Sequence, residues 1–346
     1  MSGFAERESW LDLVKAAMML WVVWGHLGLY KIVSPETSVY MLNAKIGVNM
    51  PVFFVIGGYL AASTFKNADW SKLVSRGIYF LWPQFVMAVV YSVVMMPFGK
   101  KAFDWVMNAW FLHTYAIIYI LAAVVFRTAE TDVRRWLLFF ALYIAMIFWP
   151  SCVRLGMFGQ VTHMFPYFCF GLMCLRKRPL CIGWATGCFC GAVYLAFVFL
   201  QGDSDVNGMN FWKASVHWTA LFSSETELFT FFARTVVGIS GSVFVLFLAK
   251  ILVVAAPCAA RLSFLGTTSL GIYVVHEYPL YALGGDLSVL PLPASSRWLV
   301  AICYFLACHC LIALLKRFGT TRVVLFGDEP AMANAFRRTL CLCRPK

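Results

Sequence analysis

Long apolar segments follow one another along most of the chain, and short groups of charged residues separate them. A helix of about 20 residues crosses a hydrocarbon layer roughly 30 Å thick, and most of these segments approach that length. The pattern therefore predicts an all-α, polytopic bundle of about ten transmembrane helices. The expected spans are residues 10–30, 46–65, 76–97, 110–126, 135–149, 159–175, 181–200, 228–253, 265–283 and 298–315.

These spans divide the chain into two parts of unequal size. Residues 1–315 are expected to form one transmembrane domain of helices, and residues 316–346 a short basic tail on the cytoplasmic side. No internal repeat is visible in the pattern, so the inverted repeats of many secondary transporters gain no support from it.

Composition excludes most other classes of protein. Of the 346 residues, 62% are hydrophobic and 13% are charged, and the mean hydropathy is +0.78. A soluble globular chain carries about 25% charged residues, so too few polar groups are present here to cover a water-exposed surface. A soluble enzyme, a disordered tail and a collagenous fibre are therefore excluded. The expected location is the cell membrane, inner or plasma, with membrane lipids around the helices.

The distribution of basic residues predicts the orientation. The chain carries 28 Lys and Arg against 16 Asp and Glu, a net charge of +12. These residues stand in short clusters between apolar runs. This arrangement indicates that they set the orientation of the helices in the membrane, and it does not favour a nucleic-acid partner. With the N-terminus inside, 19 of the 28 fall on the cytoplasmic side. The positive-inside rule thus predicts an even number of spans and two cytoplasmic termini. The sequence leaves a homo-oligomer open.

The 12 cysteines form neither a metal-binding nor a disulfide pattern. They are scattered through apolar stretches, and no CxxC pair occurs. We interpret them as small buried apolar residues and expect no metal site.

The first span, WLDLVKAAMMLWVVWGHLGLY, contains ionisable residues at membrane depth, where each costs a few kcal/mol or more. Asp12 and Lys15 are three residues apart, which allows a local ion pair near the cytoplasmic end. Lys15 and His26 are eleven residues apart, almost three whole turns, so they share one face and lie roughly 16 Å apart along the axis. Taken singly, Lys15 could be a snorkelling anchor and His26 a packed histidine, but their shared face favours a function.

Later spans carry further polar side chains. Trp110 shares a helix face with His113, and Tyr273 shares one with His276, each at a spacing of three residues. Glu277 falls toward the outer end of its span, where an interfacial position is the simplest interpretation.

Two other features have plain structural explanations. His309 has no polar neighbour within one turn and is interpreted as a packed histidine. Gly57 and Gly58 permit a close approach of helices, and packing explains them at least as well as catalysis.

The segment WLDLVKAAMMLWVVWGH resembles the opening span of the acyltransferase family 3 membrane proteins. That span typically has a basic residue, ten intervening residues and a histidine, which here are Lys15 and His26, with Lys in place of the commoner Arg. MPVFFVIGGYL is similar to the second span of the family, with Gly57 where Ser is usual. The segments WFLHTYAIIYIL, FPYFCFGLMCLRK and LGTTSLGIYVVH follow in the family's order. With Asp12 in its opening motif, the chain is most similar to the branch of fucose 4-O-acetylase-like proteins.

One motif departs from the family pattern. The first cytoplasmic loop often carries two arginines three apart and then a proline, whereas KLVSRGIYFLWP has Lys72 and Arg76 four apart and Pro83 later. The positive charge is retained, but its contacts with the donor need not be the same.

The resemblance implies transfer of an acyl group, usually acetyl from cytoplasmic acetyl-CoA, to a hydroxyl of a carbohydrate or lipid-linked glycan. His26 is then expected to act as general base or as carrier of the acyl group. Cationic side chains are expected to hold the phosphates of coenzyme A. The cofactor-binding candidates are Lys15, Lys72 and Arg76. The other catalytic candidates, which would stabilise the oxyanion or orient His26, are Asp12, Asn49, Trp110, His113, Tyr273 and His276.

An alternative function remains open from the same residues. A secondary transporter or flippase for an amphiphilic or lipid-linked substrate would use the intramembrane charges as a proton or ion relay. Such proteins often contain paired broken helices, and no obvious pair of Gly/Pro-interrupted spans occurs in matching halves of this sequence.

Overall fold

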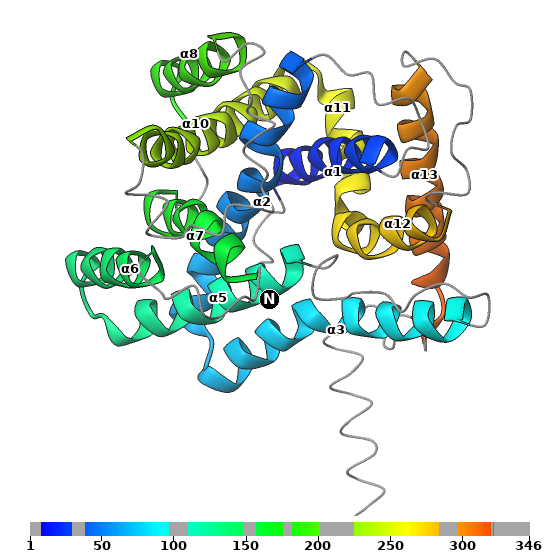
Figure 1. Cartoon of the computed structure of the whole chain (residues 1–346), viewed down its shortest axis with the longest axis horizontal. Helices are drawn as coiled ribbons and strands as arrows, with labels where there is room; N and C mark the ends of the chain where they lie inside the picture. The colour runs from blue at the N-terminus through cyan, green and yellow to red at the C-terminus, as the bar shows by residue number, and fades with distance from the viewer. Residues whose placement is uncertain are drawn as a thin grey trace, which may run out of the picture.

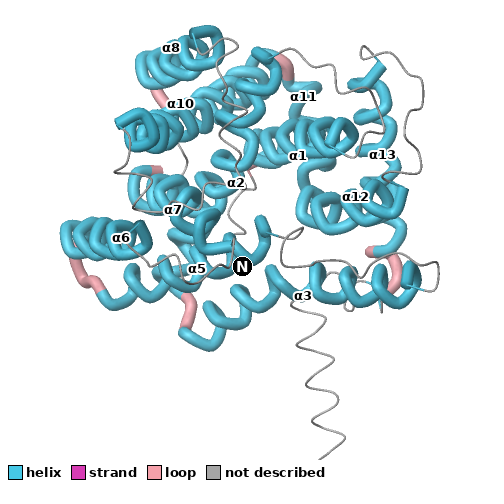
Figure 2. Tube along the Cα trace, in the orientation of Figure 1, coloured by secondary structure: helices cyan, strands magenta, loops and turns pink. Residues whose placement is uncertain are grey.

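The computed structural model describes residues 8–29, 39–96, 110–147, 157–175, 182–200, 225–283, 296–319 and 321. Every regular element within these residues is helical (Figure 2). The helices are α1 (Ser9–Leu29), α2 (Val39–Asn67), α3 (Trp70–Met95), α5 (Trp110–Thr128), α6 (Asp132–Ile147), α7 (Met157–Cys174), α8 (Trp184–Leu200), α10 (Glu225–Ala255), α11 (Pro257–Arg261), the 3₁₀ helix η2 (Leu262–Thr268), α12 (Ser269–Leu283) and α13 (Arg297–Leu315).

Each of the ten predicted apolar segments contains helix over its described residues. Seven helical segments are long and apolar enough to cross a membrane, and the shorter Trp184–Phe199 is also apolar. The ninth segment differs from the prediction, because α11, η2 and α12 follow one another from Pro257 instead of one helix from residue 265. The count of ten spans and the side of the termini stay predictions, and most of the predicted tail lies outside the described residues.

The helices surround α1. Figure 1 shows α1 near the middle of the assembly, with α2 and α10 on one side and α12 and α13 on the other. All four of these helices contact α1, as does η2. In the same view α6 and α8 lie at the margin and α3 follows one edge. The first span therefore lies at the centre of the molecule, where its polar side chains are enclosed by other helices.

Small residues let the helices approach one another closely. A β-carbon at Gly58 of α2 would lie 2.0 Å from the backbone oxygen of Phe168, and one at Gly171 of α7 would lie 2.0 Å from that of Val55. At Gly266 the backbone oxygen of Asp12 would be 1.8 Å away, so η2 rests directly on α1. Helix packing in membranes depends on such small residues, because lipid provides no hydrophobic drive for association.

Large apolar side chains cover the outside of the molecule. Val93 of α3, Phe140 of α6, Trp184 of α8 and Leu299 of α13 are each more than 60% exposed. Many polar side chains are buried instead. This distribution is the reverse of that in a soluble protein and suits a surface in contact with lipid.

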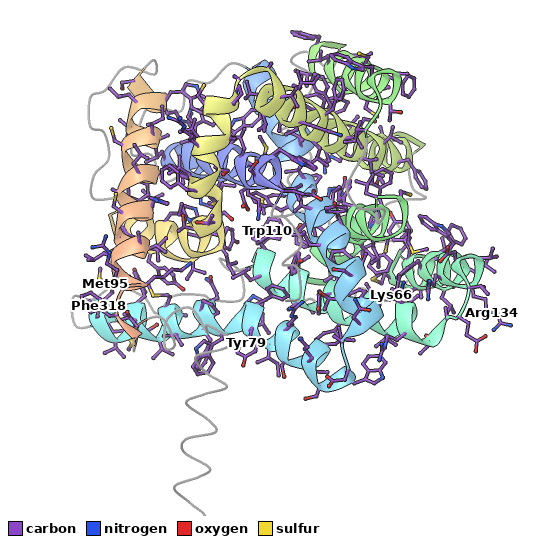
Figure 3. All side chains as sticks on the ribbon, turned by 180° about the vertical axis from the view of Figure 1, so that it is seen from behind. Lys66, Tyr79, Met95, Trp110, Arg134 and Phe318 are labelled. Atoms are coloured by element: carbon purple, nitrogen blue, oxygen red, sulfur yellow. The ribbon has the colours of Figure 1, made fainter. Side chains whose placement is uncertain are left out.

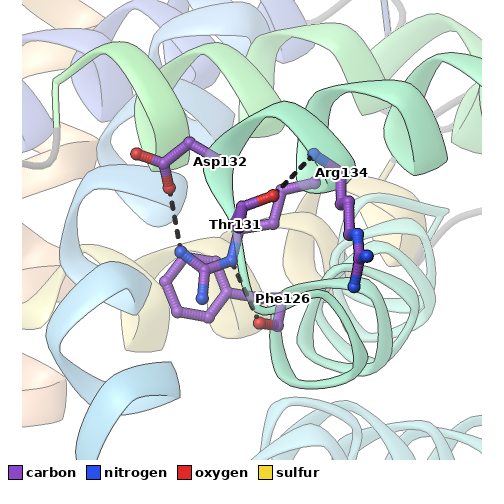
Figure 4. A network of polar contacts seen from close by, with 5 residues as sticks. Phe126, Thr131, Asp132 and Arg134 are labelled. Atoms are coloured by element: carbon purple, nitrogen blue, oxygen red, sulfur yellow. Dashed lines mark hydrogen bonds and ion pairs between the residues drawn. The ribbon is translucent and has the colours of Figure 1, made fainter.

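The turn between α5 and α6 is fixed by polar contacts (Figure 4). The hydroxyl of Thr131 accepts the backbone N–H of Arg134 and caps α6. The guanidinium of Arg135 bonds both the carboxylate of Asp132, at 2.9 Å, and the carbonyl of Phe126, and stacks 4.0 Å from the Phe126 ring. Since Phe126 belongs to α5 and the other residues to α6 or the turn before it, these contacts fasten the two helices together. Figure 3 shows Arg134 at the margin of the molecule.

Candidate active site

Two histidines from distant parts of the chain meet beside the last turn of α1. Nδ1 of His26 lies 2.9 Å from Nε2 of His276, which comes from α12. The two rings are nearly parallel, at 17°, with centroids 5.0 Å apart. His276 is fully buried, whereas His26 is only half-buried. One member of the pair is thus enclosed by protein and the other is accessible.

The hydrogen bonds of His276 assign the protons of both rings. Nδ1 of His276 is 2.9 Å from the carbonyl oxygens of both Ile272 and Tyr273, which can only accept, so this nitrogen carries a proton. In the neutral ring Nε2 is then the acceptor, and Nδ1 of His26 donates to it. A neutral His26 is left with its lone pair on Nε2. Two backbone carbonyls thereby fix the tautomer of a histidine on another helix.

Aromatic rings extend from the histidine pair toward α5. The ring of Tyr273 lies 5.8 Å from that of His276 and 5.0 Å from that of Phe111. Phe111 in turn packs edge-on against Trp110, which Figure 3 places toward the middle of the molecule. Of the predicted catalytic residues, the structure therefore links His26, His276 and Tyr273 directly, and Trp110 through Phe111.

Two other candidates are buried. Asn49 of α2 is 3% exposed, and its side-chain oxygen has no hydrogen-bond partner among the described residues. His113 is 7% exposed and lies in the first turn of α5, three residues after Trp110. A buried acceptor without a partner is costly and needs an explanation, which keeps Asn49 a candidate for contact with a ligand.

The predicted ion pair between Asp12 and Lys15 is confirmed. Their side chains are 2.6 Å apart, and Asp12 is buried. This pair lies near the start of α1, and Asp12 is 14 residues from His26, about 21 Å along a helix axis. Asp12 therefore does not contact the histidine pair. The positive charge of Lys15 is balanced by the Asp12 carboxylate.

The two remaining donor-site candidates lie on α3. Lys72 is exposed, and its backbone N–H bonds the capping side chain of Asp69. Arg76 reaches back to α2, where its guanidinium donates to the hydroxyl of Thr64 at 2.6 Å. Arg127 of α5 also bonds α2, at the carbonyl of Phe65. Arg76 of α3 and Arg127 of α5 therefore both bond the last turns of α2, at Thr64 and Phe65.

The glycine that replaces the usual serine of the second span has a packing explanation. A β-carbon at Gly57 would lie 2.6 Å from the hydroxyl oxygen of Tyr115 and 2.5 Å from its ring. The ring of Tyr115 on α5 occupies the space that a side chain at residue 57 would need. Glycine at this position is therefore coupled to tyrosine at residue 115.

Three polar residues differ from the simplest interpretation of the sequence. Glu277 is buried among the helices, which an interfacial position alone does not explain. His309 is packed as predicted, but its Nδ1 lies 2.7 Å from the hydroxyl of Thr268 in η2, a partner that helix spacing could not show. His163 of α7 is buried and interacts electrostatically with the buried Arg234 of α10, and neither residue stood out in the sequence.

Two residues of α13 that did not stand out in the sequence also contact the histidine-bearing helices. The hydroxyl of Tyr304 donates to the carbonyl of His276 at 2.7 Å. The guanidinium of Arg297 donates to the carbonyl of Trp24, two residues before His26. The seven-residue spacing of Arg297 and Tyr304 on one helix face was the available signal.

The profile of a family described as an acyltransferase domain, Acyl_transf_3, matches residues 8–317. The chain belongs to acyltransferase family 3. The match includes both histidines and all the helices listed above, so the acyltransferase domain and the helical assembly are the same unit. Together with the apolar helices, this membership makes the chain a membrane protein of an acyltransferase family.

Among curated proteins the chain is similar to "Nodulation protein NolL" of Sinorhizobium fredii (strain NBRC 101917 / NGR234). The two are 25% identical over 218 residues, which cover 55% of this chain and 58% of the relative. The chain thus spans little more than half the length of that protein. No solved structure matches the chain.

Proposed function

We propose that the chain is an integral membrane O-acyltransferase that moves acetyl from cytoplasmic acetyl-CoA to a hydroxyl of a carbohydrate or lipid-linked glycan. The observation that supports this proposal most is the bond between His26 and His276, because it leaves a lone pair at a known atom of an accessible imidazole. Family membership supports the acyl transfer, and the resemblance to O-acetylases supports the choice of donor and acceptor.

The reaction follows from the assigned protons. The acceptor oxygen attacks the thioester carbonyl while Nε2 of His26 takes the hydroxyl proton. A carbon–oxygen bond forms, the carbon–sulfur bond breaks, and the leaving thiolate takes up the proton from His26. The hydrogen bond to His276 holds the imidazole in the correct tautomer throughout, as the third member of a catalytic triad does. The same lone pair would serve if His26 carried the acetyl group covalently.

The donor is proposed to approach from the side that carries Lys72, Arg76 and Arg127. Phosphates of coenzyme A are bound well by guanidinium and ammonium groups, and Lys72 is exposed and available. Lys15, held by Asp12, would make a smaller contribution. With the predicted ten spans and cytoplasmic termini, this basic side faces the cytoplasm, and the half-buried His26 lies toward the opposite half of the cell membrane.

Acetyl-CoA is expected to stabilise the detergent-purified protein against heat. A ligand at a hundred times its dissociation constant adds about 2.7 kcal/mol to the free energy of unfolding, which a thermal-shift measurement detects. In the double variant Lys72→Ala/Arg76→Ala the shift should shrink or vanish, because two phosphate contacts are lost.

Arg134→Ala is the matched control for this experiment. Arg134 is also basic and on the same predicted side, but it is exposed on α6, next to Glu130. That variant should keep the full shift. If the wild type shows no shift over a wide range of acetyl-CoA concentrations, the proposal loses its donor, and proton-dependent transport becomes the better hypothesis.

The proposed role of His276 predicts different results for two substitutions. His276→Gln keeps an acceptor for the Nδ1 proton of His26, whereas His276→Phe fills the space and removes the acceptor. We expect about a 10²-fold or larger loss of acetyl transfer in the Phe variant and a much smaller loss in the Gln variant, by comparison with a triad whose orienting residue is changed. Equal rates in the two variants, measured by chromatography of acetyl-CoA and CoA, would contradict the orienting role.

A further inference from the structure

Arg297 is a charged residue buried at the start of α13, only 5% exposed. Its Nε–H donates to the carbonyl of Trp24 at 3.2 Å, and its guanidinium carbon lies 4.2 Å from the centre of the Trp24 ring. The neighbouring Trp298 stacks on Trp24 with ring centroids 5.2 Å apart. Arg297 and Trp298, two successive residues of α13, therefore both pack against Trp24 of α1.

The same guanidinium also contacts the backbone on the other side of His26. A β-carbon at Gly28 would lie 1.7 Å from Nη2 of Arg297 and 2.5 Å from its central carbon. The guanidinium thus occupies the space that a side chain at residue 28 would need. Because Trp24 and Gly28 flank His26 at two residues' distance on either side, Arg297 holds the turn of α1 that carries this histidine.

The same face of α13 reaches the second histidine. Tyr304 follows Arg297 by seven residues, nearly two full turns, so the two side chains lie on one side of the helix. The hydroxyl of Tyr304 donates to the carbonyl of His276 at 2.7 Å. One face of α13 therefore contacts both helices that supply the histidine pair.

We propose that Arg297 is a positioning residue that sets the distance between His26 and His276 by fixing the last turn of α1 against α13. Guanidinium suits this role because it is planar, stacks on the Trp24 ring and donates in a fixed direction. Its positive charge is also favourable near the C-terminal end of α1, where the helix dipole is negative. The consequence for acyl transfer rests on the proposed function; the effect on the histidine pair does not.

Kinetics of three variants test the proposal. Arg297→Met removes the positive charge and the N–H donors of the guanidinium, whereas Arg297→Lys keeps only the charge. Gly28→Ala leaves Arg297 unchanged but displaces its guanidinium with the new β-carbon. We expect each to lower kcat for acetyl-CoA turnover by about 10–10²-fold, the cost of a small misplacement of reacting groups, with the dissociation constant of acetyl-CoA within about twofold of wild type. The Arg297→Lys variant should recover less than half of the activity that Arg297→Met loses, because lysine cannot stack on Trp24 or donate in the fixed geometry of arginine.

The double variant Gly28→Ala/Arg297→Met separates a shared contact from two independent defects. If both single changes disturb the same contact, the double variant is no slower than the slower single variant. Losses that multiply would overturn the proposal, as would rates equal to that of Leu299→Ala. Leu299 is an exposed residue of the same helix and serves as the control for a general disturbance of α13.

A chemical probe tests the position of His26 without relying on activity. Diethyl pyrocarbonate modifies the unprotonated nitrogen of imidazole, and mass spectrometry gives its rate at His26 relative to His309. In the intact protein, Arg297→Met should move this relative rate toward the value found in His276→Phe, in which the bond between the histidines is absent. A wild-type rate in Arg297→Met would overturn the positioning role. If wild type itself transferred no acetyl, the proposed function would fail while this measurement still decided the role of Arg297.

Discussion

Replacing His26 with alanine should lower the rate of acetyl transfer by about 10²–10⁴-fold, the usual contribution of a general base. The loss follows from geometry, because the hydrogen bonds of His276 place the proton of a neutral His26 on Nδ1 and its lone pair on Nε2. Binding of acetyl-CoA should be unchanged within about twofold, because the proposed phosphate contacts lie at the other end of the bundle. The measurement is the formation of acetyl ester and free CoA by detergent-purified protein, in parallel with the thermal shift.

His309→Ala provides the control for the loss of a histidine. His309 is half-buried in α13 and bonds Thr268, and it is not part of the histidine pair. Its removal should leave the turnover number within a few-fold of wild type. Added imidazole should partly restore His26→Ala, since the missing ring is half-exposed and His276 still presents its acceptor nitrogen. Full activity in His26→Ala would disprove a catalytic role for this residue.

The same experiment distinguishes the two forms of the mechanism. A covalent route through His26 predicts an acetyl adduct on that residue after rapid quenching of the enzyme with acetyl-CoA and no acceptor. A general-base route predicts no such adduct, with the same loss in His26→Ala. Both routes require the Nε2 lone pair, so either result is consistent with the tautomer assigned from the structure.

The local features of this protein could be predicted from its sequence because they depend on neighbours along one helix. The apolar runs predicted the ten helical segments, and a spacing of three residues predicted the bond between Asp12 and Lys15. Both depend only on helix length and helix periodicity.

The histidine pair could not be predicted in the same way. His26 and His276 are 250 residues apart, and their contact depends on how α1 and α12 pack. The sequence identified His276 as one of several candidates, but only the structure separates it from Asp12, which lies near the other end of α1. Arg297 did not stand out in the sequence, although it is buried against Trp24.

The ninth segment shows a further limit of reading apolar runs. Hydropathy predicted one helix over residues 265–283, yet η2 tightens the chain between Leu262 and Thr268. The physical reason is the contact of Gly266 with the backbone of Asp12, a close approach that no hydropathy pattern records. Tertiary packing therefore decided the local conformation at this point.

Alanine at Gly58 or Gly171 should destabilise the protein severely, by about 3 kcal/mol for each change. Each new β-carbon would lie 2.0 Å from a backbone oxygen of the facing helix, and no side chain can rotate away to make room. Helices α2 and α7 would have to separate along their whole contact, which also contains the buried rings of Phe168 and Tyr59. The measurement is the thermal unfolding midpoint and the yield of monodisperse protein.

Gly77→Ala is the matched control, because Gly77 also lies inside a helix but faces a flexible neighbour. A β-carbon there would meet only Cδ1 and Cγ1 of the Ile120 side chain, each at 3.0 Å. Alanine has a helix propensity up to about 1 kcal/mol better than glycine, so this change should be neutral or stabilising. If Gly58→Ala and Gly77→Ala had the same midpoint, the backbone contact between α2 and α7 would not be as close as the structure places it. Because this contact does not include His26 or His276, any protein of the Gly58 variant that does fold should keep its turnover number, and loss of stability is thereby distinguished from loss of chemistry.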